Sequence, residues 1–198
     1  MSKQIIISIS REFGSGGHEI AEKIAKDLGL TLYDRSILDE IAEEKDIEAE
    51  ELRKLDEKPR NKLLTRKVRG HSNSMEEHLK EMQFDFIKRK ADSGESFVVV
   101  GRCSETVLKG REELISIFVL ADREAKIRHV MEKYDLSREE AITKSTRHDR
   151  TRKMYHNQHS KIKWGDSRNY DICINSSRLG VGKTAEYLEE YISMMGRM

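Results

Sequence analysis

The residues best suited to chemistry follow the first apolar run of the chain. Residues 11–19 read Arg-Glu-Phe-Gly-Ser-Gly-Gly-His-Glu and lie between the apolar run 5–10 and a segment with helical periodicity. Glycines let a backbone turn tightly and approach a ligand, and the first N–H groups of a helix attract anions. The pattern predicts a phosphate cradle formed by Gly14, Ser15, Gly16, Gly17 and His18.

This cradle departs from the usual P-loop. There, a lysine reaches the transferred phosphate and the next residue supplies a hydroxyl to Mg²⁺. Here Gly17 and His18 occupy that region. Two alternatives remain open: a tight strand-to-helix turn with no ligand, and a dinucleotide-binding fingerprint with Asp34 on the ribose. Glu19 disfavours the fingerprint, because a small residue is needed there for close packing of helix on strand.

A second glycine-lysine pair lies near the C-terminus. Gly182, Lys183 and Thr184 read like the end of a P-loop, but Ser177 stands where the motif needs its first glycine. The segment also follows the last expected strand instead of opening the fold. It is interpreted as a turn and a helix start.

The elements that position these residues alternate along the chain. Five apolar or β-branched runs have the length of strands: 5–10, 31–33, 97–100, 115–120 and 172–174. Helix-period segments lie between or after them: 19–28, 36–44, 75–90, 123–134 and 183–195. Strands that alternate with helices predict an α/β fold with a buried parallel sheet.

Charged residues are unevenly distributed along the chain. The 37 basic and 36 acidic side chains leave a net charge of +1, which gives no general attraction to nucleic acid. Basic residues nevertheless gather in 53–69 and in 144–163. We expect one domain, 1–198, with a strand-free helical insertion at about 45–92 and a lid at about 137–165.

Composition excludes several classes of protein. No apolar run approaches the roughly 18 residues of a membrane-spanning helix. Cys103 and Cys173 lack the paired spacing of a zinc site or a disulfide framework, so they are predicted to be reduced thiols in a cytoplasmic protein. His156 and His159 are predicted to be exposed lid residues, because no third metal ligand has motif spacing.

Four segments resemble the cytidylate-kinase-like family. They are the opening 7–17, Tyr33-Asp34-Arg35, the stretch 99–103 (Val-Val-Gly-Arg-Cys), and Trp164 with Tyr170-Asp171. The resemblance runs from about residue 5 to residue 192. It implies a nucleoside-monophosphate-kinase fold of the P-loop type: a three-layer sandwich with a five-stranded parallel sheet, a helical acceptor-binding insertion and an arginine-bearing lid.

The resemblance also implies roles for individual residues. ATP and Mg²⁺ would be the cofactors, and Asp149 fits the family's lid pattern. Asp34 and Arg35 would bind the acceptor, with helix capping as the alternative for Asp34. Arg11 or Arg102 would supply the cation that the missing lysine cannot. The catalytic candidates are Arg11, Arg102, Arg147 and Arg152.

These roles give a leading function and two others. The first is an ATP-dependent phosphotransferase acting on a nucleoside monophosphate such as CMP. The second is a nucleotide-binding regulatory protein that no longer turns over, and the third is a nucleic-acid-binding protein that uses the two basic stretches. The expected partner is therefore a small nucleotide and not a membrane. A homo-oligomer stays open, since Phe84, Phe86 and Ile87 suit either a core or an interface.

Overall fold

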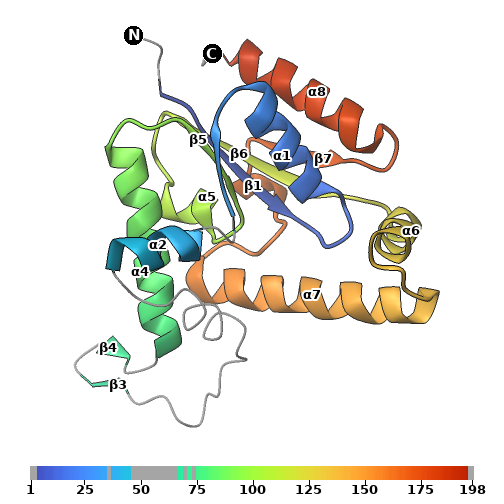
Figure 1. Cartoon of the computed structure of the whole chain (residues 1–198), viewed down its shortest axis with the longest axis horizontal. Helices are drawn as coiled ribbons and strands as arrows, with labels where there is room; N and C mark the ends of the chain where they lie inside the picture. The colour runs from blue at the N-terminus through green and yellow to red at the C-terminus, as the bar shows by residue number, and fades with distance from the viewer. Residues whose placement is uncertain (1–3, 35–36, 46–66, 69–70, 73–74, 196–198) are drawn as a thin grey trace.

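One parallel sheet organises the molecule. The computed structural model describes residues 4–34, 37–45, 67–68, 71–72 and 75–195. Its main sheet has the strand order β2-β5-β1-β6-β7, and every neighbouring pair is parallel (Figure 1). The strands are β1 (Ile6–Arg11), β2 (Thr31–Tyr33), β5 (Phe97–Val100), β6 (Leu114–Leu120) and β7 (Ile172–Asn175). The five predicted strands are confirmed, and the glycine-rich segment after β1 leaves the centre of the sheet.

Helices cover both faces of the sheet. Apolar residues of α1 and α8 pack on one face, and those of α2 and α4 pack on the other. The helices are α1 (Gly17–Asp27), α2 (Ile37–Lys45), α4 (Met75–Asp92), α5 (Ser104–Val107), α6 (Arg123–Tyr134), α7 (Arg138–His159) and α8 (Gly180–Met194). This arrangement confirms the three-layer sandwich. Gly182, Lys183 and Thr184 lie in the first turns of α8, as the helix-start interpretation predicts.

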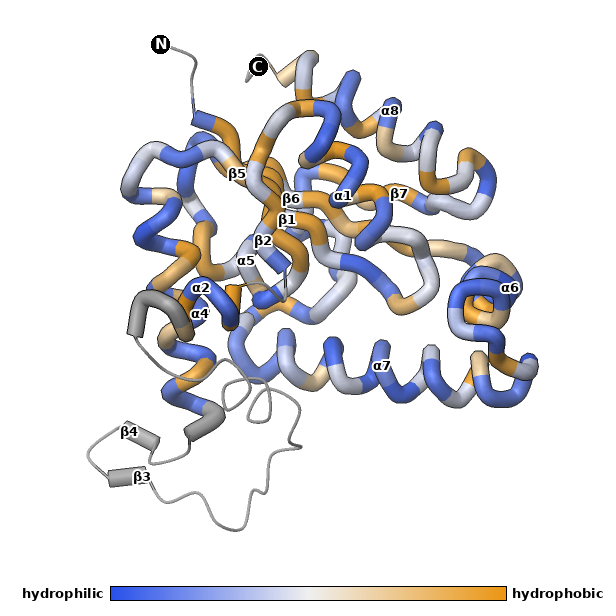
Figure 2. The backbone as a smooth tube through the Cα atoms, in the orientation of Figure 1, coloured by the Kyte–Doolittle hydropathy of each residue, from blue (hydrophilic) through white to orange (hydrophobic). Residues whose placement is uncertain are grey.

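The core explains why the strands read as continuous apolar runs. Successive side chains of a strand point to opposite faces, so Ile7 packs in the α1–α8 layer and Ile6 in the α2–α4 layer. Both side chains are fully buried. Hydrophobic residues accordingly concentrate in the strands, whereas α7 is largely hydrophilic (Figure 2).

The stretch between β2 and β5 differs from its prediction. Short antiparallel strands β3 (Lys67–Val68) and β4 (His71–Ser72) form a separate two-stranded sheet where no strand was predicted. Two residues are too few to show an alternating pattern, so the sequence carries no signal for them. Most of the expected insertion and of the first basic stretch, 46–66, lies outside the described residues.

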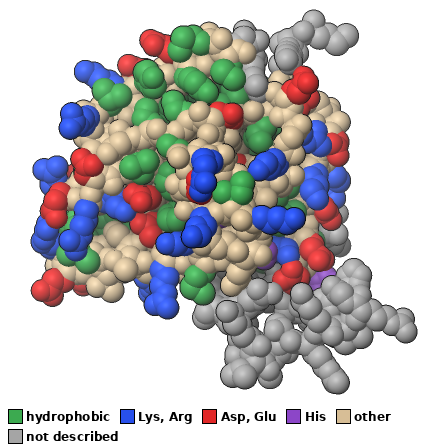
Figure 3. Space-filling model, turned by 180° about the vertical axis from the view of Figure 1, so that it is seen from behind, with side chains coloured by type: hydrophobic (Ala, Val, Ile, Leu, Met, Phe, Trp, Pro, Cys, Tyr) green, Lys and Arg blue, Asp and Glu red, His purple; other side chains and the backbone are tan. Residues whose placement is uncertain are grey.

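The surface carries mixed charge. Seen from behind, basic and acidic side chains intermingle over most of the face, and apolar side chains gather towards its upper edge (Figure 3). Within the described part of the chain, no helix is long and apolar enough to cross a bilayer.

Candidate functional site

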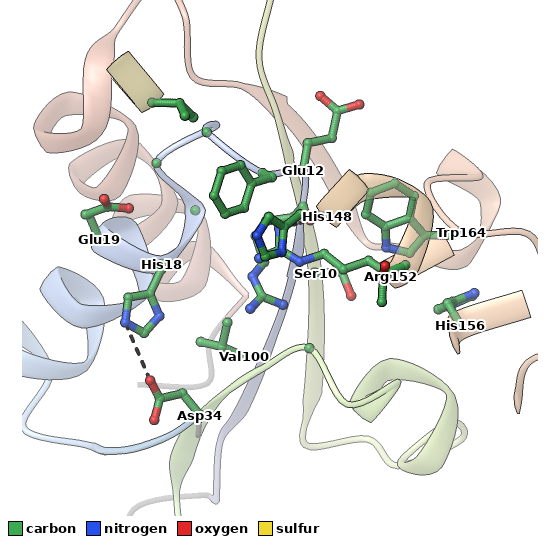
Figure 4. Close-up of a pocket in the computed structure, with 18 of the residues that line it drawn as sticks. Ser10, Glu12, His18, Glu19, Asp34, Val100, His148, Arg152, His156 and Trp164 are labelled. Carbon is green, nitrogen blue, oxygen red and sulfur yellow. Dashed lines mark hydrogen bonds and ion pairs between the residues drawn. The ribbon is translucent and has the colours of Figure 1, made fainter. Parts of the chain in front are cut away.

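A cavity of about 520 Å³ opens where β1, β2 and β5 end and α1 begins. Helices α6 and α7 supply its other walls, and side chains from these separate segments converge on it (Figure 4). In open parallel sheets, ligands bind beyond the carboxyl ends of the strands. Eight of the predicted site residues line this cavity: Arg11, Gly14, Gly16, Gly17, His18, Asp34, Arg102 and Arg152.

Two predicted site residues do not line the cavity, and a third cannot be placed. Ser15 is buried, and its hydroxyl donates a hydrogen bond to the Glu12 carbonyl oxygen at 2.9 Å, so it shapes the loop. Arg147 is exposed on α7, away from the cavity. Arg35 lies outside the described residues.

The glycine-rich loop is wedged between two helices. A Cβ at Gly14 would stand 2.8 Å from Val130 of α6, and one at Gly16 would stand 2.6 Å from Val181 of α8. Both glycines also have positive φ, 82° and 73°. Ser176 fixes the loop from the α8 side by donating to the Ser15 carbonyl oxygen at 2.6 Å. Larger residues would displace the loop from both helices.

Arg11 takes the space that a side chain at position 17 would need. A Cβ built on Gly17 would lie 2.6 Å from the Arg11 Cβ and 3.0 Å from its Cγ. The Arg11 side chain continues across Gly101, where a Cβ would lie 2.5 Å from Nη1. Position 17 is where a usual P-loop carries its lysine. The arginine therefore lies over the loop where a lysine stem would begin, and glycines at 17 and 101 make room for it.

The turn after β5 has an uncommon backbone. Gly101, Arg102 and Cys103 have φ of 75°, 57° and 52° in succession. Positive φ in residues other than glycine costs about 1–3 kcal/mol each and concentrates at functional sites. The Arg102 Nη1 donates to the Gln83 side chain of α4 at 3.1 Å, which directs this arginine toward the insertion side of the cavity.

Helix α7 is joined directly to the loop. The Phe13 N–H donates to Asp149 Oδ1 at 2.6 Å, and Arg152 Nη1 donates to the Arg11 carbonyl oxygen at 3.4 Å. The Phe13 ring stacks on His148 with a centroid separation of 4.4 Å. Sequence reasoning singled out Asp149 and Arg152 but missed the Phe13–His148 stack, whose two residues belong to no common motif.

Lys126 of α6 completes the contact of α7 with the loop. Its Nζ lies 3.2 Å from Asp149 and 3.1 Å from Glu12. Burial alone would lower the pKa of Lys126, but the hydrogen bond to Glu12 and the charge of Asp149 raise it above its usual value. The lysine stays charged and holds both carboxylates beside the loop.

The opposite side of the cavity carries His18 and Asp34. Their side chains approach to 3.5 Å (Figure 4), and His18 also lies 3.3 Å from Glu22. Asp34 lines the cavity, and helix α2 begins three residues later, at Ile37.

Glu19 adds a further charged side chain to the lining of the cavity. It pairs with Lys133 and, at 3.2 Å, with His129. Burial would raise the pKa of Glu19, yet the hydrogen bond from Lys133 and the nearby positive charges bring it below its usual value. Glu19, His129 and Lys133 all line the cavity and were not predicted as site residues.

The prediction that His156 is exposed is wrong. Its side chain is buried, and its Nε2 lies 2.7 Å from Glu105 Oε1 of α5. His159, one turn further on, packs its ring edge-on against Phe84 of α4. The C-terminal half of α7 is thus packed against α5 and α4.

Comparison with known proteins identifies the family. The model of the cytidylate kinase-like family matches residues 6–178. The chain belongs to the cytidylate kinase-like family. No curated protein matches this cytidylate kinase-like chain. Among solved structures, it is similar to an uncharacterized protein from Eubacterium ventriosum ATCC 27560, with 36% identity, a TM-score of 0.76, and coverage of 96% of this chain and 99% of that chain.

Two shikimate kinases share the fold of this cytidylate kinase-like protein. The one from Bacteroides thetaiotaomicron has 12% identity and a TM-score of 0.55 over 96% of this chain and 98% of that chain. The one from Acinetobacter baumannii, in complex with shikimate, has 13% identity and a TM-score of 0.55 over 98% and 95%. The P-loop kinase fold is confirmed, and family and fold support a phosphotransferase as the general class.

Proposed function

We propose that this protein transfers the terminal phosphoryl group of ATP to a nucleoside monophosphate such as CMP. The observation that carries the proposal is the position of Arg11, which crosses Gly17 and Gly101 at the floor of the cavity. A P-loop that had lost its lysine without replacement would leave no fixed cation there. Here an arginine, always charged and able to donate two parallel hydrogen bonds to phosphate oxygens, occupies that space.

The other residues suit the donor. Helix α1 starts at Gly17, and the first N–H groups of a helix lack partners within it, so the loop offers donors to phosphate oxygens. Arg102 and Arg152 approach the same cavity from β5 and α7. Phosphoryl transfer depends mainly on positioning and on cations around a group whose negative charge is spread over several oxygens. We propose α7 as the lid that carries Arg152 to the donor.

We also propose that Mg²⁺ accompanies ATP, as the family resemblance implies. Glu12, Glu19 and Asp34 line the cavity but, in the described part of the chain, do not form a three-carboxylate cluster, so each would contact Mg²⁺ singly beside the phosphates. When bound, Mg²⁺ would neutralise part of the negative charge of the donor phosphates. A cytoplasmic location belongs to the same proposal, since both cysteines are free thiols, as in reducing compartments.

We assign the acceptor to the side of the cavity formed by Asp34 and Arg102. Arg102 donates to Gln83 of α4, and Asp34 lies near His18. On this side of the cavity the carboxylate of Asp34 would accept from a hydroxyl of the ligand, and the guanidinium of Arg102 would bind its phosphate. CMP rests on the family resemblance. A second candidate is a protein that binds nucleotide without turnover. It is favoured by Gly17 and His18, which stand where a usual P-loop has its lysine and its serine or threonine.

An ATP-consumption assay tests the proposal. The protein, ATP and Mg²⁺ are incubated with a panel of nucleoside monophosphates, nucleosides and shikimate, and ADP is measured beside a calorimetric ATP titration. ADP formation that depends on a nucleoside monophosphate supports the kinase. ATP binding with no turnover on any acceptor supports the regulatory candidate, and absence of ATP binding contradicts both.

The space around Arg11 gives a sharper prediction. Gly101→Ala is expected to lower turnover at least tenfold, because the new Cβ would stand 2.5 Å from Arg11 Nη1 and displace the guanidinium. Gly94→Ala is the matched control: Gly94 also has a positive φ, 82°, but nothing lies within 4 Å of its Cβ position. Both substitutions cost about 1–3 kcal/mol of backbone strain. Equal losses of activity in the two variants would show that strain, and not Arg11, is responsible.

A further inference from the structure

Three potential metal ligands meet beneath the cavity. Cys103 ends the strained turn after β5, Glu105 lies on α5 and His156 lies on α7. Their ligand atoms all lie within 4.8 Å of one another, and the three residues are only 3%, 2% and 3% exposed. Cys103 and His156 also line the cavity, so an ion has a route to them. Figure 4 shows His156 on the same side of the cavity as Trp164.

Neighbouring groups orient two of the three ligands. Ser10 donates to Glu105 Oε2 at 3.1 Å, while Oε1 faces His156 and accepts from Thr106 Oγ1 at 3.3 Å. On the other side of the imidazole, Nδ1 lies 3.4 Å from the Asn157 side-chain oxygen, an acceptor for an Nδ1–H. Ligating histidines usually donate their second N–H in this way, and here the arrangement points Nε2 at Glu105.

The donor set indicates which ion would bind. Thiolate and imidazole are poor ligands for Mg²⁺ or Ca²⁺, whereas sulfur, nitrogen and carboxylate oxygen together are typical of Zn²⁺. We propose that Cys103, Glu105 and His156 bind Zn²⁺ and thereby fasten helix α7 to the turn that carries Arg102. Water from the cavity supplies the fourth ligand.

Small side-chain movements complete the site. Tetrahedral zinc ligands stand roughly 3.3–3.8 Å apart, given Zn–N and Zn–S bonds of about 2.0 and 2.3 Å. The 2.7 Å contact between His156 and Glu105 therefore opens by somewhat under 1 Å, while the thiol approaches. Binding releases to solvent the thiol proton and the proton shared between His156 Nε2 and Glu105 Oε1, while the Nδ1–H faces Asn157.

The site has a consequence for the lid. His156 lies four residues after Arg152, on the same face of α7. Fixing His156 to the β5–α5 turn holds Arg152 near the glycine-rich loop and keeps Arg102 at the end of its strand. Zinc would thus stabilise the closed arrangement of the two arginines without taking part in phosphoryl transfer.

Metal titration of the full chain tests the proposal. The protein is stripped with a chelator and titrated with Zn²⁺ by calorimetry, and with Co²⁺ in the absorption spectrum, where a thiolate ligand gives a charge-transfer band. The wild type and Cys173→Ser, which removes the other cysteine, are expected to bind one ion tightly with that band. Cys103→Ser is expected to lose the band and at least about 100-fold in zinc affinity, more than second-shell changes cost.

Several outcomes would overturn the site. They are no tight binding to the wild type, equal affinity in wild type and Cys103→Ser, or a cobalt band that disappears only in Cys173→Ser. Thermal unfolding of the metal-free variants establishes that each one folds. If Cys103→Ser does not fold, His156→Gln takes its place, and the same loss of zinc affinity is expected.

Discussion

Arg11→Ala is expected to reduce ATP turnover by about 10³-fold or more, the scale of an arginine that contacts transferred phosphate in this chemistry. The reason is positional. Arg11 ends the central strand β1, and its side chain covers Gly17 and crosses to Gly101 after β5, so its removal takes away the cation beside the glycine-rich loop. The measurement is acceptor-dependent ADP formation by the purified variant. Arg128→Ala, which changes an exposed arginine of α6 outside the cavity, is the control and should keep wild-type turnover.

A double substitution separates this role from a structural one. Gly17→Lys alone is expected to be inactive, because its Cβ would lie 2.6 Å from the Arg11 Cβ. Combined with Arg11→Gly, the lysine gains space and restores the usual P-loop cation, so turnover should recover at least tenfold over either single variant. An additive loss in the double variant would contradict the exchange of lysine for arginine and leave Arg11 as a packing residue.

How much the sequence predicts depends on where the signal lies. The central strands β1, β5 and β6 were predictable because they are buried on both faces and therefore read as short apolar runs such as 97–100. The glycine-rich turn was predictable because the turn, the close approach of the backbone and the helix start are all encoded locally by glycines. The replacement of the P-loop lysine by Arg11 was predictable only in part. The sequence shows that position 17 is a glycine and that an arginine ends the first strand. Their contact required the three-dimensional loop.

Helix α7 shows the limit of sequence reasoning. Its buried residues are Ala141, Ser145 and His156, so it has no apolar stripe from which an inward face can be recognised. The sequence accordingly predicts His156 as one more polar residue of an exposed lid. Its partners Cys103 and Glu105 lie about fifty residues away without motif spacing. A cluster made by docking a polar helix leaves no local pattern, which is why zinc was not expected.

The same cluster should dominate the stability of the docked helix. Glu105→Ala, measured with a chelator present, is expected to lower the free energy of unfolding by about 3–5 kcal/mol, as when one partner of a buried pair is removed. The loss arises because Glu105 accepts from Ser10 and pairs with His156, and both groups would remain buried without it. Denaturant unfolding followed by fluorescence of Trp164, the sole tryptophan, reports the change.

Two controls identify the source of that loss. Glu190→Ala, on the exposed face of α8, should change stability by no more than about 0.5 kcal/mol. Glu105→Ala combined with His156→Ala should cost far less than the sum of the two single changes, because the second substitution removes a group that the first has already left unsatisfied. Strict additivity would mean that the two side chains do not interact. Helix α7 would then be held by its contacts with Phe13 and Phe84, and Arg152 would owe its position to Asp149 rather than to His156.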